Sequence, residues 1–156
     1  MNLPKRGAVG LMNVPPGVAM TADERLSSIL TSALQAIPGT RDAILLSHEG
    51  LPIAYSEGLP QQAAEYGAAV ISTTAGIVRG VARFWSQPDP VWRETIIDFD
   101  RGRAIVVAVG PHAFLVVFTA SSVNVDLVLA RLHDLAQRLG SEVTTDVRHR
   151  AVLPWT

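Results

Sequence analysis

The sequence predicts an α+β domain: a five-stranded antiparallel sheet with helices, in the order α-β-β-α-β-β-β-α. Residue periodicity, turn signals and composition together predict this class. Segments whose apolar residues recur at helical spacing are separated by groups of short apolar runs that end in turns. The chain has 156 residues, which is the size of one domain. Apolar residues make up 48% and charged residues 17%, as in globular proteins.

The same totals argue against several kinds of function. A net charge of −1 indicates no basic surface for nucleic acid or for an anionic membrane. Because the chain has no cysteine, disulfides, thiolate nucleophiles and cysteine-ligated zinc are excluded. The lack of cysteine also fits a cytoplasmic location. No segment reaches the roughly 18–20 apolar residues that a membrane-spanning helix needs.

The first helix is predicted to begin at Thr21, because the sequence TADE fits the S/T-x-x-E capping box. It should end at Pro38, which is followed by glycine. The apolar residues of this helix recur at helical spacing: Leu26, Ile29, Leu30, Ala33, Leu34 and Ile37. Residues 1–20 contain many prolines and glycines without a period, so we expect them to form a flexible N-terminal arm.

A hairpin and a long helix should follow. Two short apolar runs, DAILLS and LPIAYS, are joined by a tight turn from Ser47 to Gly50. Pro52 can occupy only an edge strand or the first residue of a strand. From Pro60 to about Trp85 the chain is free of proline and mostly small or apolar, which predicts a second helix of up to roughly 25 residues.

The last part of the domain is predicted to be a three-stranded meander and a final helix. The strands are expected at residues 91–99, 103–109 and 113–120. The last two are almost wholly apolar and should be central. The final helix should begin near Ser121, with Ser121 or Ser122 as its N-cap, and end at Gly140. Residues 21–140 then form a single domain, and residues 141–156 form a C-terminal tail.

The sequence contains no convincing catalytic, cofactor-binding or metal-binding motif, and we expect no cofactor. Phosphate-binding loops of the known glycine-rich kinds are absent, and the four histidines lack a metal-ligand spacing. His48 and Glu49 are adjacent, but no third residue completes a catalytic set, so the polar tip of a hairpin is the simpler interpretation. Asp98 and Asp100 lead into a turn, where aspartate is favoured for backbone hydrogen bonds.

The second helix carries an unusual pattern of small residues. Ala68, Ser72, Gly76 and Gly80 lie four residues apart, and therefore on one face. Glycine inside a helix costs about 1 kcal/mol relative to alanine. Small residues permit another backbone to approach closely, which would offset that cost. The pattern alone leaves open whether this face packs on the sheet of the same chain or on a second copy.

The sequence resembles the roadblock family of dynein light-chain-like domains, in its bacterial, actinomycete-type form, over about residues 22–140. The segments that carry the resemblance are AILLSHEGLPIAYS, AAEYGAAVISTTAGIVRGVARFW and GRAIVVAVGPHAFLVVFTASS. Ser47, Gly50 and the sequence Leu51-Pro52-Ile53 match the first hairpin of the family, with Glu49 where aspartate is common. The resemblance implies a roadblock-like, profilin-like sandwich: a five-stranded antiparallel sheet with helices on both faces.

The resemblance also implies a homodimer. The second helix would pair antiparallel with its copy, and the third strand, at about Val91–Phe99, would extend the sheet across the two subunits. The implied interface residues are Ala68, Ser72, Ala75, Gly76, Arg79, Gly80, Arg83, Trp92, Arg93 and Glu94.

The function implied by the resemblance is a non-catalytic, homodimeric regulator or scaffold of a Ras-like small GTPase, in a cytoplasmic bacterial signalling module. Such a protein can accelerate GTP hydrolysis without a catalytic residue of its own. A sensor-kinase-like protein is a further implied partner. Two alternatives stay open: a small-ligand sensor with a pocket between the sheet and the helices, and a hydrolase that uses His48 with Glu49 or a serine.

Overall fold

The computed structural model describes residues 21–85, 88–89 and 91–152, with backbone alone for residues 145–152. The predicted N-terminal arm, residues 1–20, lies outside the described residues, as do residues 153–156 of the predicted tail. The elements in chain order are α1 (Ala22–Ala36), β1 (Thr40–Ser47), β2 (Pro52–Tyr55), α2 (Gln61–Phe84), β3 (Glu94–Asp98), β4 (Gly102–Val109), β5 (Ala113–Ala120) and α3 (Val125–Val152).

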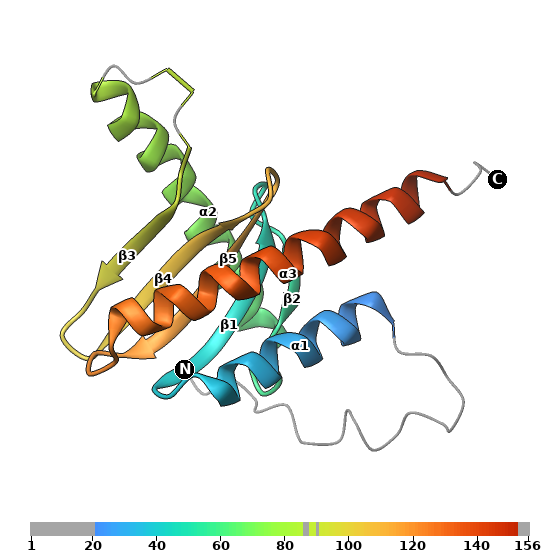
Figure 1. The fold of residues 1–156 in the computed structure, drawn as a ribbon, viewed down its shortest axis with the longest axis horizontal. Coiled ribbons are helices and arrows are strands. Elements are labelled where there is room, and N and C mark those ends of the chain that lie inside the picture. The colour runs from blue at the N-terminus through green and yellow to red at the C-terminus, as the bar shows by residue number, and fades with distance from the viewer. Residues whose placement is uncertain (1–20, 86–87, 90, 153–156) are drawn as a thin grey trace.

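The middle layer is a five-stranded sheet in the order β2-β1-β5-β4-β3. All four strand pairs are antiparallel. Helices α1 and α3 cover one face of this sheet, and α2 lies on the other (Figure 1). The predicted fold class and element order are confirmed, and so is the central position of β4 and β5.

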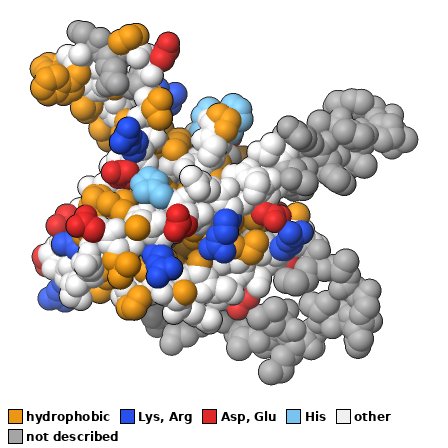
Figure 2. Space-filling view, in the orientation of Figure 1, with side chains coloured by type: hydrophobic (Ala, Val, Ile, Leu, Met, Phe, Trp, Pro, Cys, Tyr) orange, Lys and Arg blue, Asp and Glu red, His pale blue; other side chains and the backbone are white. Residues whose placement is uncertain are grey.

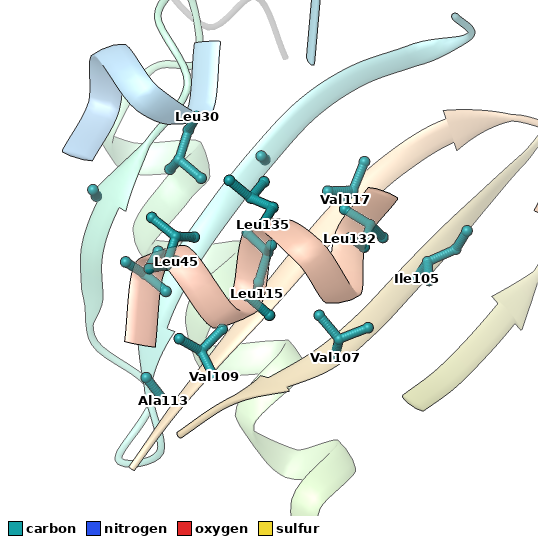
Figure 3. Close-up of a cluster of buried hydrophobic side chains, with 14 of the residues drawn as sticks. Leu30, Leu45, Ile105, Val107, Val109, Ala113, Leu115, Val117, Leu132 and Leu135 are labelled. Atoms are coloured by element: carbon teal, nitrogen blue, oxygen red, sulfur yellow. The ribbon is translucent and has the colours of Figure 1, made fainter. Parts of the chain in front are cut away.

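The larger hydrophobic core fills the space between the sheet and the α1–α3 layer. Alternate residues of the strands point into it, as the two-residue period of a strand requires. Leu30 of α1 and Leu132 of α3 belong to this core together with Leu45 and Leu115 of the sheet (Figure 3). Each of these four side chains is fully buried, and each contributes roughly 1.5–3 kcal/mol through removal of its apolar surface from water.

A smaller core lies on the opposite face, between the sheet and α2. Ile44 and Leu46 of β1 point into it and contact Ala68 and Ile71 of the helix. The alanine side chain lets the helix axis lie close to the strands. The C-terminal part of α2 leaves the sheet and projects away from the body of the domain (Figure 1). Only part of this helix is therefore held by its own chain.

The N-terminus of α1 confirms the predicted capping box. Oγ1 of Thr21 accepts a hydrogen bond from the backbone N–H of Glu24 at 3.2 Å. The backbone N–H of Thr21 in turn donates to Oε2 of Glu24 at 3.2 Å. The two bonds satisfy donors that a helix start otherwise leaves free. The helix ends two residues before Pro38, as expected.

Two predicted boundaries are wrong. The last helix continues through Gly140 to Val152, so the predicted tail begins as helix. Gly140 packs where α3 crosses the β4–β5 turn: a Cβ atom there would lie 3.9 Å from the backbone nitrogen of Gly110. Glycine is permitted inside a helix at a cost of about 1 kcal/mol relative to alanine, so Gly140 does not end α3. The helix start is capped by Asn124, whose Oδ1 accepts from the N–H of Leu127 at 3.2 Å, and not by Ser121 or Ser122.

The strand β3 is shorter than predicted, because residues 91–93 precede it without strand pairing. Trp92 instead packs its ring against Phe114, with the ring centroids 4.6 Å apart. Its Nε1 donates to Oγ1 of Thr95 at 2.8 Å. These side-chain contacts fix the approach to the strand before the backbone ladder with β4 begins.

Candidate interaction surface

Helix α2 has two apolar faces. Its inner face is made of small and medium side chains that pack on the sheet and the first hairpin. The buried apolar residues of this face are Ala64, Ala68, Ile71 and Ala75. Gly67 lies at the same contact, since a Cβ atom there would be 2.8 Å from Cδ1 of Ile44. The inner face is therefore fitted to the chain's own sheet.

The outer face of α2 carries large apolar side chains that point away from the sheet. We call these residues the outer stripe: Tyr66, Val70, Ile77, Val81 and Phe84. Tyr66 is 75% exposed, Ile77 64% and Phe84 85%. Figure 2 shows apolar side chains gathered at the projecting end of this helix. Since exposed apolar patches of this kind mark interaction sites, the outer stripe is the main candidate surface.

The glycines near the outer stripe have open space around them. A Cβ atom placed on Gly76 or Gly80 would meet no heavy atom within 4 Å. Within the described residues, nothing in this chain requires glycine at either position. Glycine lowers helix stability by about 1 kcal/mol relative to alanine. The space that these two residues leave is available to another molecule.

The strand β3 forms an open edge of the sheet. Ile96 and Phe99, at and just beyond this strand, are 43% and 58% exposed. Glu94 is held from the other side by α3, because its Oε2 lies 3.0 Å from Nε2 of His133. An edge strand presents unpaired N–H and C=O groups that can pair with another strand. The edge is thus a second candidate contact.

The opposite edge, β2, is protected. It begins at Pro52, which lacks an N–H group, and its pairing with β1 shifts between Leu45 and Leu46. Ile53, on this strand, packs with α1 in the larger core. Proline and irregular pairing are the usual means of blocking an edge. The two edges of this sheet therefore differ in their capacity to pair.

The ten residues that the family resemblance implies for the interface do not form one exposed patch. Ala68 and Ala75 are buried inside the chain, and Ser72 packs at the first hairpin turn, where a Cβ on Gly50 would lie 2.7 Å from its Oγ. Trp92 is half-buried. Six of the ten are exposed, on α2 or at the start of β3: Gly76, Arg79, Gly80, Arg83, Arg93 and Glu94.

The sequence analysis missed the outer stripe. The signal that could have found it is the spacing of the large residues Tyr66, Val70, Ile77 and Phe84, which fall on one helical face. Of the small residues at four-residue spacing, Ala68 and Ser72 pack on their own chain, whereas Gly76 and Gly80 are exposed. Because α2 is apolar on both sides, periodicity alone does not tell which side is inward.

The paired residues His48 and Glu49 form an exposed tip with the neighbouring turn. The imidazole rings of His48 and His112 are 5.9 Å apart between centroids. Oε1 of Glu49 is 3.7 Å from Nε2 of His48. A backbone hydrogen bond and one from the Ser47 hydroxyl hold the pKa of the Glu49 carboxyl below its ordinary value. Across the described ranges, no three histidine or acidic side chains are placed to hold a metal ion.

The two aspartates near the β3–β4 turn do not act as a carboxylate pair. Oδ1 of Asp98 accepts a hydrogen bond from Nε of Arg103 at 3.0 Å. Arg103 also donates to the carbonyl of Val123 at 3.3 Å, which ties the turn to the start of α3. The role of Asp98 is therefore structural.

None of the helices in the described part of the chain is both long enough and apolar enough to cross a bilayer.

Fold and surface together define a class: a three-layer α+β sandwich domain with an open sheet edge and a helix that is apolar on both faces. The chain belongs to the Roadblock/LC7 domain family, whose sequence profile matches residues 26–119. No curated protein sequence is significantly similar to it.

Solved structures share the fold at low sequence identity. A Roadblock/LC7 domain from Streptomyces avermitilis is 22% identical, with 76% of this chain and 97% of that chain covered and a TM-score of 0.70. The gliding protein MglB from Thermus thermophilus is 19% identical, with 80% and 93% covered and a TM-score of 0.67. MglB from Myxococcus xanthus is 12% identical, with 78% and 96% covered and a TM-score of 0.68.

Proposed function

We propose that this chain is a homodimeric, non-catalytic regulator or scaffold of a Ras-like small GTPase in a bacterial signalling module. The observation that carries the proposal is the outer stripe of α2, an apolar surface that the chain itself leaves exposed. Membership of the Roadblock/LC7 family and the likeness to MglB support it. The proposal includes a cytoplasmic location and a sensor-kinase-like protein as a further partner.

The dimer is proposed to use the exposed parts of α2 together with the open edge β3. Burial of the exposed apolar surface of Ile77 and Phe84 by a partner favours association, because that surface leaves water. Pairing of β3 with a second copy satisfies backbone groups that the edge leaves free. Arg93 and Glu94 stand at the start of that strand, where charged residues limit pairing to a suitable partner.

The GTPase is proposed to bind the dimer and not to receive a catalytic group from it. Arg79 and Arg83 are exposed on α2, and we propose that they lie in the dimer interface. Arginine is frequent in interface hot spots, so exposure alone does not make either residue an arginine finger. Any acceleration of hydrolysis would then come from rearranged loops of the GTPase.

The test mixes the purified chain with the small GTPase encoded nearest to its gene, loaded with GTP or GDP. Size exclusion with light scattering gives the mass of each complex, and phosphate release gives the hydrolysis rate. A dimer that binds the GTP form is expected. Faster hydrolysis would define an activator, and an unchanged rate a scaffold. A chain that is monomeric and binds neither form would overturn the proposal.

A matched pair of variants tests whether a charge disrupts the dimer only in the outer stripe or at any exposed apolar position. Ile77→Asp places a charge in the outer stripe, whereas Leu127→Asp places the same charge on α3 at an apolar residue of 48% exposure. We expect Ile77→Asp to yield monomers at concentrations where the unchanged chain is a dimer. Leu127→Asp should leave the mass unchanged. Equal behaviour of the two variants would contradict the role of the stripe.

A further inference from the structure

The open edge strand β3 carries two acidic residues on the face that is turned toward α3. Glu94 and Asp98 are the first and the last residue of the strand. They lie four residues apart and therefore on the same face of the sheet. Ile96 lies between them and is 43% exposed, whereas Ile97 packs into the smaller core on the other face. The open edge is thus acidic at both of its ends.

Each acidic residue has one basic partner, and the two partners differ in kind. Nε2 of His133 on α3 lies 3.0 Å from Oε2 of Glu94. Nε of Arg103 on β4 lies 3.0 Å from Oδ1 of Asp98. Arginine in a protein is always charged, whereas histidine is the side chain whose charge changes between about pH 5 and 8. One end of the edge is therefore neutralised permanently, and the other end only while His133 carries a proton.

Among the described residues, His133 is the one basic group that binds Glu94. Val107, the residue of β4 opposite Glu94, is uncharged. Three other charged residues adjoin the pair in the chain or lie on the same side of α3: Arg93, Asp126 and Asp134. In the described part of the chain, none of these three forms an ion pair with Glu94 or His133. The charge on Glu94 is thus offset by a single titratable group.

We propose that the proton on His133 regulates the pairing of the open edge with a second copy of this chain. This inference rests on the proposed homodimer and adds the group that controls its strength. When two β3 strands pair antiparallel about a two-fold axis over all five residues, Ile96 faces its own copy. Glu94 of each chain then lies directly opposite Asp98 of the other.

Charge decides whether this arrangement is favourable. Residues directly opposite each other on antiparallel strands have Cβ atoms about 4.5–5.5 Å apart, and like charges in such a pair are destabilising. Arg103 offsets the charge of Asp98 throughout. A protonated His133 offsets the charge of Glu94, so that two neutralised pairs meet. A neutral His133 with its hydrogen on Nε2 keeps the hydrogen bond but leaves the negative charge of Glu94 opposite Asp98.

The direction of the pH effect follows from this contact. On dimer formation, each His133–Glu94 pair gains the carboxylate of Asp98 from the other chain as a neighbour, which favours the protonated histidine. The dimer is therefore strongest below the pH range in which histidine titrates, and it weakens as the pH rises through that range. Because one dimer contains the contact twice, we expect its dissociation constant to be about three- to tenfold larger at pH 8 than at pH 6.

The test measures the dissociation constant of the full chain by dilution and light scattering at pH 6 and pH 8. His133→Arg keeps the positive charge at both values, so its dimer should be tight at both. His133→Gln lacks the charge, so its dimer should be weak at both. His112→Gln is the matched control, because it removes an exposed histidine of the β4–β5 turn. This control should keep the pH dependence of the unchanged chain.

Glu94→Gln distinguishes regulation from a merely structural role of the ion pair. If the pair only fastened β3 to α3, its loss would weaken the dimer at both pH values. On the proposed mechanism the substitution removes the repelling charge. The dimer of Glu94→Gln should then be tighter at pH 8 than that of the unchanged chain, and its pH dependence should disappear. Far-UV circular dichroism checks that each variant is folded.

The outcomes separate this inference from the proposed function. A dimer with equal dissociation constants at pH 6 and pH 8 would overturn the inference and leave the homodimer in place. A pH dependence that persists in His133→Gln would also overturn it, and so would a Glu94→Gln dimer that is weaker than the unchanged one at pH 8. A chain that is monomeric at both pH values would overturn the proposed homodimer and, with it, the role of His133.

Discussion

The two faces of α2 reverse the usual order of an amphipathic helix. The face that packs on the sheet is built from alanines such as Ala64 and Ala68, whereas the face that points to solvent carries Tyr66, Ile77 and Phe84. A surface helix ordinarily turns its large apolar residues inward. A helix that is apolar on all sides belongs inside a larger body. The comparison teaches that alanines pack this helix closely on its own sheet, whereas the large apolar residues remain exposed and available for contact with another molecule.

The largest effect is expected where the inner face is enlarged. Ala68→Leu adds three carbons at a site with no exposed surface, against Ile44 and Leu46 of β1. We expect a loss of about 2–3 kcal/mol in the free energy of unfolding, because overfilled cores shift side chains and backbone. Urea unfolding followed by far-UV circular dichroism measures it. Ile77→Asp on the outer face, in dilute monomer, should stay within about 0.5 kcal/mol. Equal losses of unfolding free energy in the two variants would contradict the difference in packing between the two faces.

A smaller effect is expected at the turn on which the inner face rests. Gly50 has a φ of +90°, and a Cβ atom there would lie 2.7 Å from Oγ of Ser72. Gly50→Ala therefore combines an unfavourable backbone conformation with a steric conflict, and should cost about 2 kcal/mol of stability. Thermal unfolding measures the change. In the double variant with Ser72→Ala, the steric part should be reduced, because the closest contact is removed, and the backbone part should remain. An unchanged melting temperature for Gly50→Ala would show that α2 is not seated on this turn.

The smallest effect compares two glycines of the same helix. Gly76→Ala should stabilise the monomer by about 0.5–1 kcal/mol, because alanine favours the helix and the site is open. Gly67→Ala has the same intrinsic advantage, but its Cβ would lie 2.8 Å from Cδ1 of Ile44. We expect Gly76→Ala to exceed Gly67→Ala in stability by about 1 kcal/mol. If urea unfolding shows equal gains in stability for the two variants, neither glycine lies in the packed face.

Much of the fold could be predicted from the sequence, because its elements carry strong local signals. The capping box at Thr21 and the apolar runs of β4 and β5 each specify one structure. The end of α3 could not be predicted in this way. Glycine occurs both at helix ends and inside helices, so Gly140 alone does not tell whether the helix stops there or continues to Val152.

The candidate surface was harder to predict for a physical reason. Both faces of α2 are apolar, so periodicity identifies the helix without telling which side the sheet covers. Which side of α2 faces the sheet depends on the distance between the helix and the sheet, because a short distance accommodates Ala68 and not Ile77. That distance is a property of the assembled sheet and not of any segment. Arg79 and Arg83 lie at the surface, as a solvated or an interface residue would, and their type alone does not choose between these roles.

The unequal edges of the sheet limit how far it can grow. Pro52 and the irregular pairing of β2 block one edge, so the described sheet has one edge, β3, at which a further strand can pair. Two chains that join through β3 use up each other's single open edge, and the joined sheet ends at both sides in a closed strand. In the proposed dimer, edge pairing would therefore stop at two chains. An open edge strand ordinarily carries a risk of open-ended, fibre-like association. With one open edge per chain, the same strand would limit the assembly to two chains.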